Sequence, residues 1–151
     1  MGFQRSRLYA LFCLPFRRRQ GAVRDDWADE WHYAYVCKVY DGDTITVEVL
    51  RHGRWVIQSV RLAGIDTPEL RTKDAAEKAM AEAARTALST QILDEHVWLH
   101  CQGREKYGRI LGEIYPTTWF RGRKSLSYNQ WLLEAGHAKP YDGGTKGTWT
   151  S

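Results

Sequence analysis

The stretch from Val60 to Glu69, VRLAGIDTPE, places residue types suited to a phosphate and a metal ion close together. Arg61, Asp66 and Glu69 fall within nine residues, and Pro68 prevents a strand from running on through the stretch. Carboxylate oxygens at such a turn suit a hard divalent cation, and a guanidinium beside them suits a phosphate. The stretch therefore predicts part of a site at which a cation and a phosphate meet.

Two other pieces of the chain carry similar residue types. Asp41-Gly42-Asp43-Thr44 opens one expected strand, and Glu105 to Arg109, EKYGR, occupies an expected hairpin. Each piece alone has an ordinary explanation, because Asp and Gly are common in turns and a single arginine on a strand is usually solvated. Their occurrence together favours one site built from three separate parts of the chain.

These pieces need strands to position them, and β-branched and aromatic residues are dense from Tyr33 onward. His52-Gly53 separates the second and third runs, where a glycine supplies the positive φ of a hairpin turn. Strands are expected over residues 33–39, 44–50, 55–64, 96–101 and 109–115.

Two helices are expected around these strands. Residues 74–93 are rich in helix-forming residues, and Asp74 and Glu77 are spaced like a capping box. A second amphipathic helix is expected from about Leu126, with Gly136 as its C-cap, followed by a loop to the end of the chain. The apolar face of the first helix is expected to contain Ala76, Met80, Ala83, Ala87 and Leu88.

Five short strands, with one helix after the third and another after the fifth, are typical of a small OB-fold barrel. We therefore predict an α+β fold that is mainly β, with a five-stranded OB-fold barrel and two packed helices. A chain of 151 residues with 43% hydrophobic residues can bury one core. Residues 31–151 are expected to form this domain, and residues 1–30 a mobile arm that is first basic and then acidic.

The net charge of +4 is unevenly distributed. Residues 1–24 carry six arginines and no acid, and residues 25–30 carry four acids and no base. From residue 31 onward the chain has 16 basic and 14 acidic residues. Bulk charge is therefore weak support for a nucleic-acid partner, and specific arginines must carry that interpretation.

The N-terminal residues leave the compartment open. Residues 8–16, LYALFCLPF, are apolar but far shorter than the ~20 residues that span a bilayer. A signal peptide and N-myristoylation are both compatible with the basic start and with Met1-Gly2. The three cysteines lack paired spacing, which favours small buried hydrophobic residues over a disulfide framework. We expect a cytoplasmic protein without a membrane span, with secretion as the alternative.

The segments DGDTITV, RLAGIDTPE and KYGRILGEIY, in that order, resemble the staphylococcal nuclease family, also called thermonucleases, over about residues 33–141. The resemblance implies an OB-fold nuclease that uses calcium to hydrolyse phosphodiester bonds of DNA and RNA, leaving 3′-phosphate ends. It implies that Asp43 and Asp66 are the carboxylate ligands of calcium, with the main-chain carbonyl of Thr67 as a further ligand. Pro68 would hold Thr67 extended and so help to aim that carbonyl.

The resemblance also assigns the residues that act on the phosphate. Glu69 matches the glutamate proposed to activate the attacking water, which is a reasonable role for a carboxylate near the metal. Arg61 and Arg109 match two arginines that hold the scissile phosphate, where charge grows in the transition state.

Four further positions complete these expectations. Asp41 matches an aspartate near the metal, and Tyr141 matches a tyrosine that contacts the nucleotide, where its ring could stack on a base. Lys139 is a second candidate for contact with the nucleotide, while Tyr107 is expected to pack within its hairpin.

The spacing of Arg61 and Asp66 raises a geometric question. They are five residues apart, so a regular strand would direct them to opposite faces. Gly64 lies between them and permits a bulge or bend. We therefore expect a break in the strand between Ala63 and Asp66.

Two functions remain from different classes. A calcium-dependent nuclease that acts as a monomer on DNA or RNA requires the two metal carboxylates, the base and both phosphate arginines, and all five are present. A non-catalytic OB-fold module that binds nucleic acid or protein would be expected to have lost some of them. The residues favour the enzyme.

Overall fold

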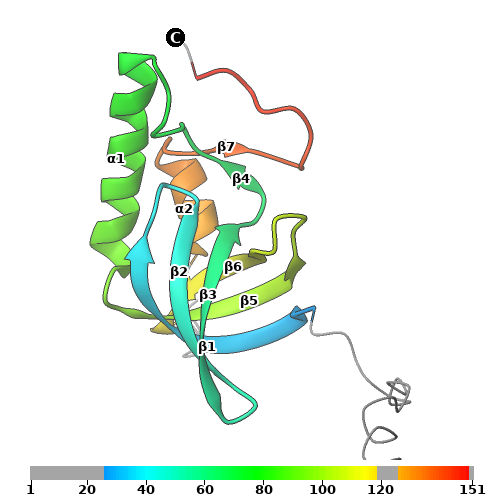
Figure 1. Cartoon of the computed structure of the whole chain (residues 1–151). Helices are drawn as coiled ribbons and strands as arrows, with labels where there is room; N and C mark the ends of the chain where they lie inside the picture. Colours follow the sequence, from blue (N-terminus) through cyan, green and yellow to red (C-terminus); the bar gives the residue numbers. More distant parts are fainter. Residues whose placement is uncertain (1–25, 119–125, 150–151) are drawn as a thin grey trace, which may run out of the picture.

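Five strands of the chain close into one barrel. The structure, a computed structural model, describes residues 26–118 and 126–149. Around the barrel the strands follow the order β1 (Ala28–Val39), β2 (Thr44–Arg51), β3 (Arg54–Leu62), β6 (Ile110–Pro116) and β5 (His96–Arg104). Neighbours are antiparallel except β3 and β6, which run parallel (Figure 1). The predicted mainly β fold with a five-stranded OB-type barrel is confirmed.

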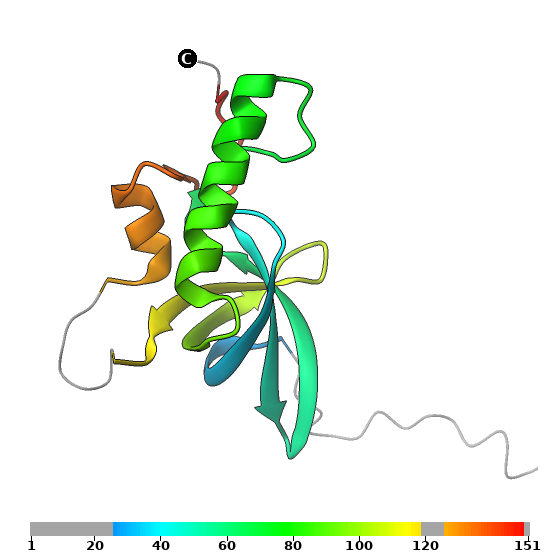
Figure 2. The same ribbon diagram turned by 90° about the vertical axis from the view of Figure 1, so that its left-hand side faces the viewer.

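Two helices and a second, smaller sheet accompany the barrel. Helix α1 (Ala75–Ile92) contacts β1, and helix α2 (Tyr128–Glu134) contacts β6 and α1 (Figures 1 and 2). The short strands β4 (Ile65–Asp66) and β7 (Lys139–Pro140), which were not predicted, pair with each other. Within residues 26–118 and 126–149, neither helix is long and apolar enough to cross a membrane.

The barrel interior is filled by alternate residues of its strands. Side chains of successive strand residues point to opposite faces, so one residue in two enters the core. Valine, leucine and isoleucine side chains from all five strands are fully buried there; examples are Val36, Val47, Val60, Leu99 and Ile114. This burial is the main stabilisation of the barrel that holds the site.

Strand β1 begins at Ala28, five residues before the expected strand at Tyr33. Trp27, just before it, is buried, and the guanidinium of Arg51 lies 4.0 Å from its ring centre. The described fold therefore includes residues 26–30, which are part of the acidic segment that was assigned to the arm. The rest of the predicted arm, up to residue 25, lies outside the described residues.

Gly64 separates β3 from β4. Its φ of 75° is a left-handed conformation that residues with a side chain adopt at a cost. The predicted break between Ala63 and Asp66 is confirmed. Because of this turn, Asp66 returns to Arg61 and the two side chains contact each other.

Helix α1 buries a different face from the expected one. Its start is confirmed, because the carboxylate of Asp74 accepts hydrogen bonds from the N–H groups of Ala76 and Glu77 at 2.8 and 3.3 Å. The buried side chains are Ala81, Ala84, Leu88 and Ile92. The expected apolar face was therefore wrong except at Leu88. Alanines lie on every side of this helix and give little contrast, so its two bulkiest buried residues determine which face packs.

Helix α2 starts and ends close to the expected positions. The Oγ atom of Ser127 accepts a hydrogen bond from the N–H of Gln130 at 3.1 Å and caps the first turn. Gly136 follows the helix with a left-handed φ of 75°, as a glycine at a helix C-terminus often does. The chain after β7 has no regular secondary structure up to Trp149, in agreement with the predicted loop.

One side chain of α2 ties that helix to the barrel. The amide nitrogen of Asn129 donates hydrogen bonds to the carbonyls of Ala63 and Gly112 at 2.9 and 3.3 Å. Its amide oxygen accepts from the N–H of Ile114 at 3.2 Å. Asn129 is buried, so these bonds are shielded from water. Since Ala63 directly precedes Gly64, Asn129 also supports the turn that brings Asp66 to Arg61.

Asn129→Ala should therefore destabilise the fold. The substitution removes the side-chain partner of the Ile114 N–H and of the Ala63 carbonyl, whereas the Gly112 carbonyl still accepts from the N–H of Ala63. We expect the free energy of unfolding to fall by about 2–4 kcal/mol. Urea denaturation followed by far-UV circular dichroism measures this change. Gln130→Ala is the control, because the side chain of Gln130 is exposed and donates a hydrogen bond to Glu134 in the same helix. Equal losses in the two variants would contradict the role of Asn129.

Candidate active site

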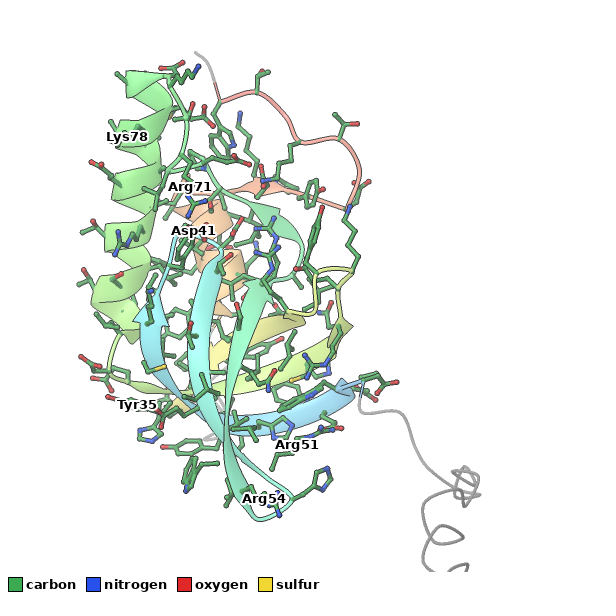
Figure 3. All side chains as sticks on the ribbon, in the orientation of Figure 1. Tyr35, Asp41, Arg51, Arg54, Arg71 and Lys78 are labelled. Atoms are coloured by element: carbon green, nitrogen blue, oxygen red, sulfur yellow. The ribbon has the colours of Figure 1, made fainter. Side chains whose placement is uncertain are left out.

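The candidate site lies in an open cleft of about 950 Å³ at one end of the barrel. Parts of the chain that are far apart in sequence line the cleft: the turn after β1, the segment from β3 to Arg71, the β5–β6 hairpin and the segment after β7. Figure 3 shows Asp41 and Arg71 near this end, whereas Arg54 marks the tip of the β2–β3 hairpin at the other end. The three pieces identified in the sequence therefore meet in one place.

Arg61 forms the centre of the site. Its guanidinium contacts the carboxylate of Asp43 through Nη1, and Nη2 lies 3.3 Å from Asp66 Oδ1. Nη2 also donates a hydrogen bond to the carbonyl of Ile65 at 3.2 Å. All three ionic side chains are buried, with 4% of Asp43 and of Asp66 and 8% of Arg61 exposed.

Burial and the neighbouring negative charges shift the pKa of Arg61 in opposite directions. Burial lowers the pKa of its guanidinium, whereas Asp43 and Asp66 raise it, and the net direction is upward. The side chain is therefore a permanent positive charge between two buried carboxylates. A positive charge at this position can hold a phosphate beside the same carboxylates.

The turn between β1 and β2 holds Asp43 in place. Thr44 Oγ1 and the N–H of Thr67 donate hydrogen bonds to the two carboxylate oxygens of Asp43 at 3.0 and 3.4 Å. The N–H of Asp43 donates to Asp41 Oδ1 at 3.2 Å. Gly42 allows this turn to lie against Thr67, because a Cβ at residue 42 would come within 3.0 Å of the Thr67 side chain. Asp43 and Thr67, 24 residues apart, are thus direct neighbours.

In this turn, Asp41 is the residue whose pKa is clearly shifted. Burial, and then the negative charge of Asp43, raise the pKa of Asp41 to about 6. Its ordinary value is about 3.9. Asp41 thus belongs to the acidic side of the cleft, although in the structure it contacts the main chain of Asp43 rather than Arg61.

Arg109 reaches the same group of residues through Thr44. Its Nη1 donates a hydrogen bond to Thr44 Oγ1 at 3.3 Å, and its Nε contacts the carboxylate of Glu105. Thr44 in turn bonds Asp43. Glu105 and Arg109 both lie on the β5–β6 hairpin, so the hairpin orients its own arginine toward the cleft.

Glu69 lies at the exposed edge of the cleft. Its side chain is 59% exposed, and its Oε1 lies 2.8 Å from the Nζ atom of Lys146. The same Nζ atom lies 3.2 Å from Asp66 Oδ1, so Lys146 links the two carboxylates. The N–H of Glu69 also donates to Glu77 in α1 at 3.3 Å. Lys146 therefore joins Glu69 to the central ion pairs.

The remaining predicted residues divide between the cleft and its surroundings. Tyr141 lines the cleft, with its ring centre 5.9 Å from the guanidinium of Arg61. Lys139 does not line it: its Nζ donates to the carbonyl of Thr148 at 2.9 Å and lies 4.3 Å from the ring centre of Trp149. Tyr107 lines the cleft and is 73% exposed, and its ring centre lies 4.9 Å from the Nζ atom of Lys106 in the same hairpin. Its ring thus contacts its own hairpin, as expected, but is not buried there.

Sequence reasoning missed three side chains that organise the site. Thr44 and Glu105 orient Asp43 and Arg109, and both stood inside the quoted segments without a role of their own. Lys146 had no signal, because it is one lysine in a glycine-rich tail.

The oxygen atoms of the cleft suit a hard cation. The expected ligands are two carboxylates and one main-chain carbonyl, from Asp43, Asp66 and Thr67, which is a donor set for calcium or magnesium rather than zinc. In the part of the chain that the structure describes, no three acidic, histidine or cysteine side chains cluster around a point suited to a metal ion. A cation here would therefore depend on main-chain, water or phosphate oxygens beside the two carboxylates.

Asp41→Asn should stabilise the free protein at neutral pH. Because the pKa of Asp41 is raised to about 6, the charged form of its carboxyl group is disfavoured in the folded protein. The free energy of unfolding of the unaltered protein should therefore rise as the pH falls from above 6 toward the ordinary pKa of an aspartate. The variant keeps an acceptor for the N–H of Asp43 but removes the charge. We expect a gain of about 1 kcal/mol at neutral pH, after a discount for solvent screening, that disappears near pH ~4.

Thermal unfolding with a chelator, measured over this pH range, tests the expectation. Glu82→Gln, which removes an exposed carboxylate on α1, is the control. A constant difference between Asp41→Asn and the unaltered protein at all pH values would contradict the assignment.

The chain is similar in sequence to several known proteins. Probable endonuclease LCL3 of Kluyveromyces lactis is 26% identical over 75% of this chain and 43% of its own length. Protein ParB of Escherichia coli is 36% identical over 53% of this chain and 40% of its own length. Uncharacterized protein MJ1439 of Methanocaldococcus jannaschii is 26% identical over 85% of this chain and 74% of its own length. The chain thus spans less than half of the LCL3 and ParB relatives.

A family model described as "Staphylococcal nuclease homologue" matches residues 59–147, which is more than half of the chain. The match runs from β3 into the segment after β7. It contains Arg61, Asp66, Glu69 and Arg109, whereas Asp43 and Thr44, which meet two of these residues in the cleft, precede the matched range. The chain therefore belongs to the family of staphylococcal nuclease homologues.

Proposed function

We propose that this protein is a calcium-dependent nuclease that hydrolyses phosphodiester bonds of DNA or RNA to 3′-phosphate ends. The observation that carries the proposal is the position of Arg61, a buried guanidinium in contact with both Asp43 and Asp66. Such a guanidinium can bind a phosphate directly beside two carboxylates that can bind a metal ion. This arrangement suits metal-assisted phosphodiester hydrolysis. The relatives named probable endonuclease support the same reaction class.

In this proposal Asp43, Asp66 and the main-chain carbonyl of Thr67 hold the calcium ion. When bound, calcium supplies positive charge that polarises the phosphate and favours ionisation of a nearby water. The hydrogen bonds from Thr44 and from the N–H of Thr67 fix the carboxylate of Asp43 before any cation arrives. Preorganised oxygens of this kind lose little freedom on binding.

The protein's own residues then act on the phosphate and the water. Arg61 and Arg109 bind its non-bridging oxygens, and their bonds strengthen as charge grows in the transition state. Glu69 accepts the proton of the attacking water, since it is the acidic side chain of this group that is largely exposed to solvent. Attack on phosphorus with departure of the 5′ oxygen leaves the phosphate on the 3′ side.

The shape of the cleft favours flexible substrates. It is open and bears three aromatic rings, those of Tyr40, Tyr107 and Tyr141, on which bases could stack. Stacking on a ring requires a base that can leave the duplex. We therefore expect single-stranded nucleic acid to be cleaved at least as well as duplex, by the protein as a monomer.

Cleavage of labelled single-stranded DNA tests the proposal. Activity should require calcium and disappear with a chelator, and Glu69→Gln and Arg109→Ala should each reduce the rate roughly 10²–10³-fold because they remove a proton acceptor and a transition-state contact. Gel electrophoresis of the products over time measures the rates. Arg54→Ala, at the far end of the barrel, is the control for loss of an arginine (Figure 3).

Two results would reject the mechanism in different ways. Equal cleavage with calcium, with chelator and by both variants would mean that another group performs the reaction. Binding of DNA without cleavage under any condition would favour the alternative, a non-catalytic OB-fold module.

The ends of the products provide an independent test. A 5′-labelled oligonucleotide should yield labelled fragments that carry a 3′-phosphate, because the 5′ oxygen is the leaving group. Phosphatase treatment should therefore slow the migration of these fragments in a denaturing gel. Fragments that are unchanged by phosphatase and that ligate directly through their 3′-hydroxyl would contradict the proposed bond cleavage.

A further inference from the structure

The segment after β7 folds back to the candidate metal site. The N–H of Tyr141 donates a hydrogen bond to the carbonyl of Gly64 at 3.0 Å, at the start of this segment. Near its end, the carbonyl of Thr148 accepts from Lys139 Nζ at 2.9 Å, and that Nζ lies over the ring of Trp149. Figure 1 shows the segment leaving β7 and returning above β4 toward α1. The segment is thus attached at both ends beside the two short strands.

Lys146 lies between these two attachments and contacts the acids of the site. Its Nζ is 2.8 Å from Glu69 Oε1 and 3.2 Å from Asp66 Oδ1. The side chain of Asp66 is 6% exposed, whereas that of Lys146 is 45% exposed. The ammonium therefore approaches a buried carboxylate from the solvent side, which is the side open to the cleft.

Lys146 contacts the same oxygen of Asp66 as Arg61 does. Oδ1 of Asp66 accepts from Arg61 Nη2 at 3.3 Å and lies beside Lys146 Nζ. A divalent cation on this carboxylate would stand next to the ammonium, and like charges in contact repel strongly where water is partly excluded. An exposed lysine can move away, since its flexible side chain is held by pairs that are individually weak.

We propose that Lys146 competes with the divalent cation for Asp66 and Glu69. Its ammonium binds these two carboxylates in the free protein and leaves them when the cation binds. This inference rests on the proposed metal site. Departure of Lys146 also loosens the segment between Tyr141 and Trp149, because the contacts of Lys146 with the two acids join that segment to β4 and to the residues just after it. Cation binding and the position of the segment are therefore coupled.

Calorimetric titration of the full chain with calcium, without nucleic acid, tests the competition. Lys146→Gln should bind calcium roughly three- to tenfold more tightly than the unaltered protein, and Lys146→Arg should bind it about as weakly. Lys106→Gln is the matched control, since Lys106 lines the same cleft and its Nζ atom lies over the ring of Tyr107. It reports the effect of removing one positive charge from the cleft.

Hydrogen exchange of the segment provides a second readout that does not depend on activity. Calcium should speed exchange of the main-chain amides of residues 142–148 in the unaltered protein, and Lys146→Gln should show that faster exchange already without calcium. Calcium that slows exchange in this segment would overturn the inference.

The outcomes separate this inference from the proposed function. If the unaltered protein binds calcium but Lys146→Gln binds it no more tightly than Lys106→Gln, the competition is wrong and the metal site stands. Weaker binding by Lys146→Gln would also overturn it, because Lys146 would then position the acids for the cation. If no variant binds calcium, the proposed metal site is itself wrong, and the competition falls with it.

Discussion

The ion pairs of one buried arginine constrain the whole site. Arg61 cannot remain buried without negative partners, because an unpaired charge in a protein interior costs several kcal/mol. It finds Asp43 on one side and Asp66 on the other. Asp66 can reach it only because the chain turns at Gly64, and Asp43 only because β2 pairs with β3 in the register that sets Thr44 opposite Arg61. Fold and site are therefore specified by the same contacts.

This constraint explains why distant elements converge on the cleft. Asn129 of α2 bonds the carbonyl just before Gly64, and Gly42 lets the β1–β2 turn approach Thr67 and α1. Neither side chain takes part in the proposed chemistry, yet each residue sets the position of one carboxylate of the central pair. A shift of either carboxylate would leave Arg61 partly unpaired, so the barrel, both helices and the site are stabilised together.

The sequence predicted the features that follow from local chemistry. Alternating β-branched residues indicated the strands, Asp74 indicated the start of α1, and Gly64 indicated the bend between Arg61 and Asp66. The buried face of α1 was missed because an alanine-rich helix offers little contrast between its sides. The β4–β7 pair was missed because two residues in each strand are too few for a recognisable pattern.

The site was predictable only in part for a similar reason. Segment order and residue type identified the acids and arginines, since those residues carry the chemistry. The partners of these residues depend on three-dimensional placement: Glu105 holds Arg109, and Lys146 joins Asp66 to Glu69. A lysine in a glycine-rich segment has no periodicity or motif that connects it to acids 77 and 80 residues earlier in the chain.

These partners bear on which ions the cleft can accept. In the structure Asp43, Asp66, Glu69 and Glu105 each contact an arginine or lysine, so a cation or phosphate that enters must replace or share an existing pair. A monovalent cation offers no more charge than the ammonium that it would displace. A divalent cation brings twice the charge to the same oxygens, and it can release a positive side chain toward the phosphate that arrives with it. The internal ion pairs are thus compatible with the proposed function, in which a doubly charged ion and a phosphate bind together.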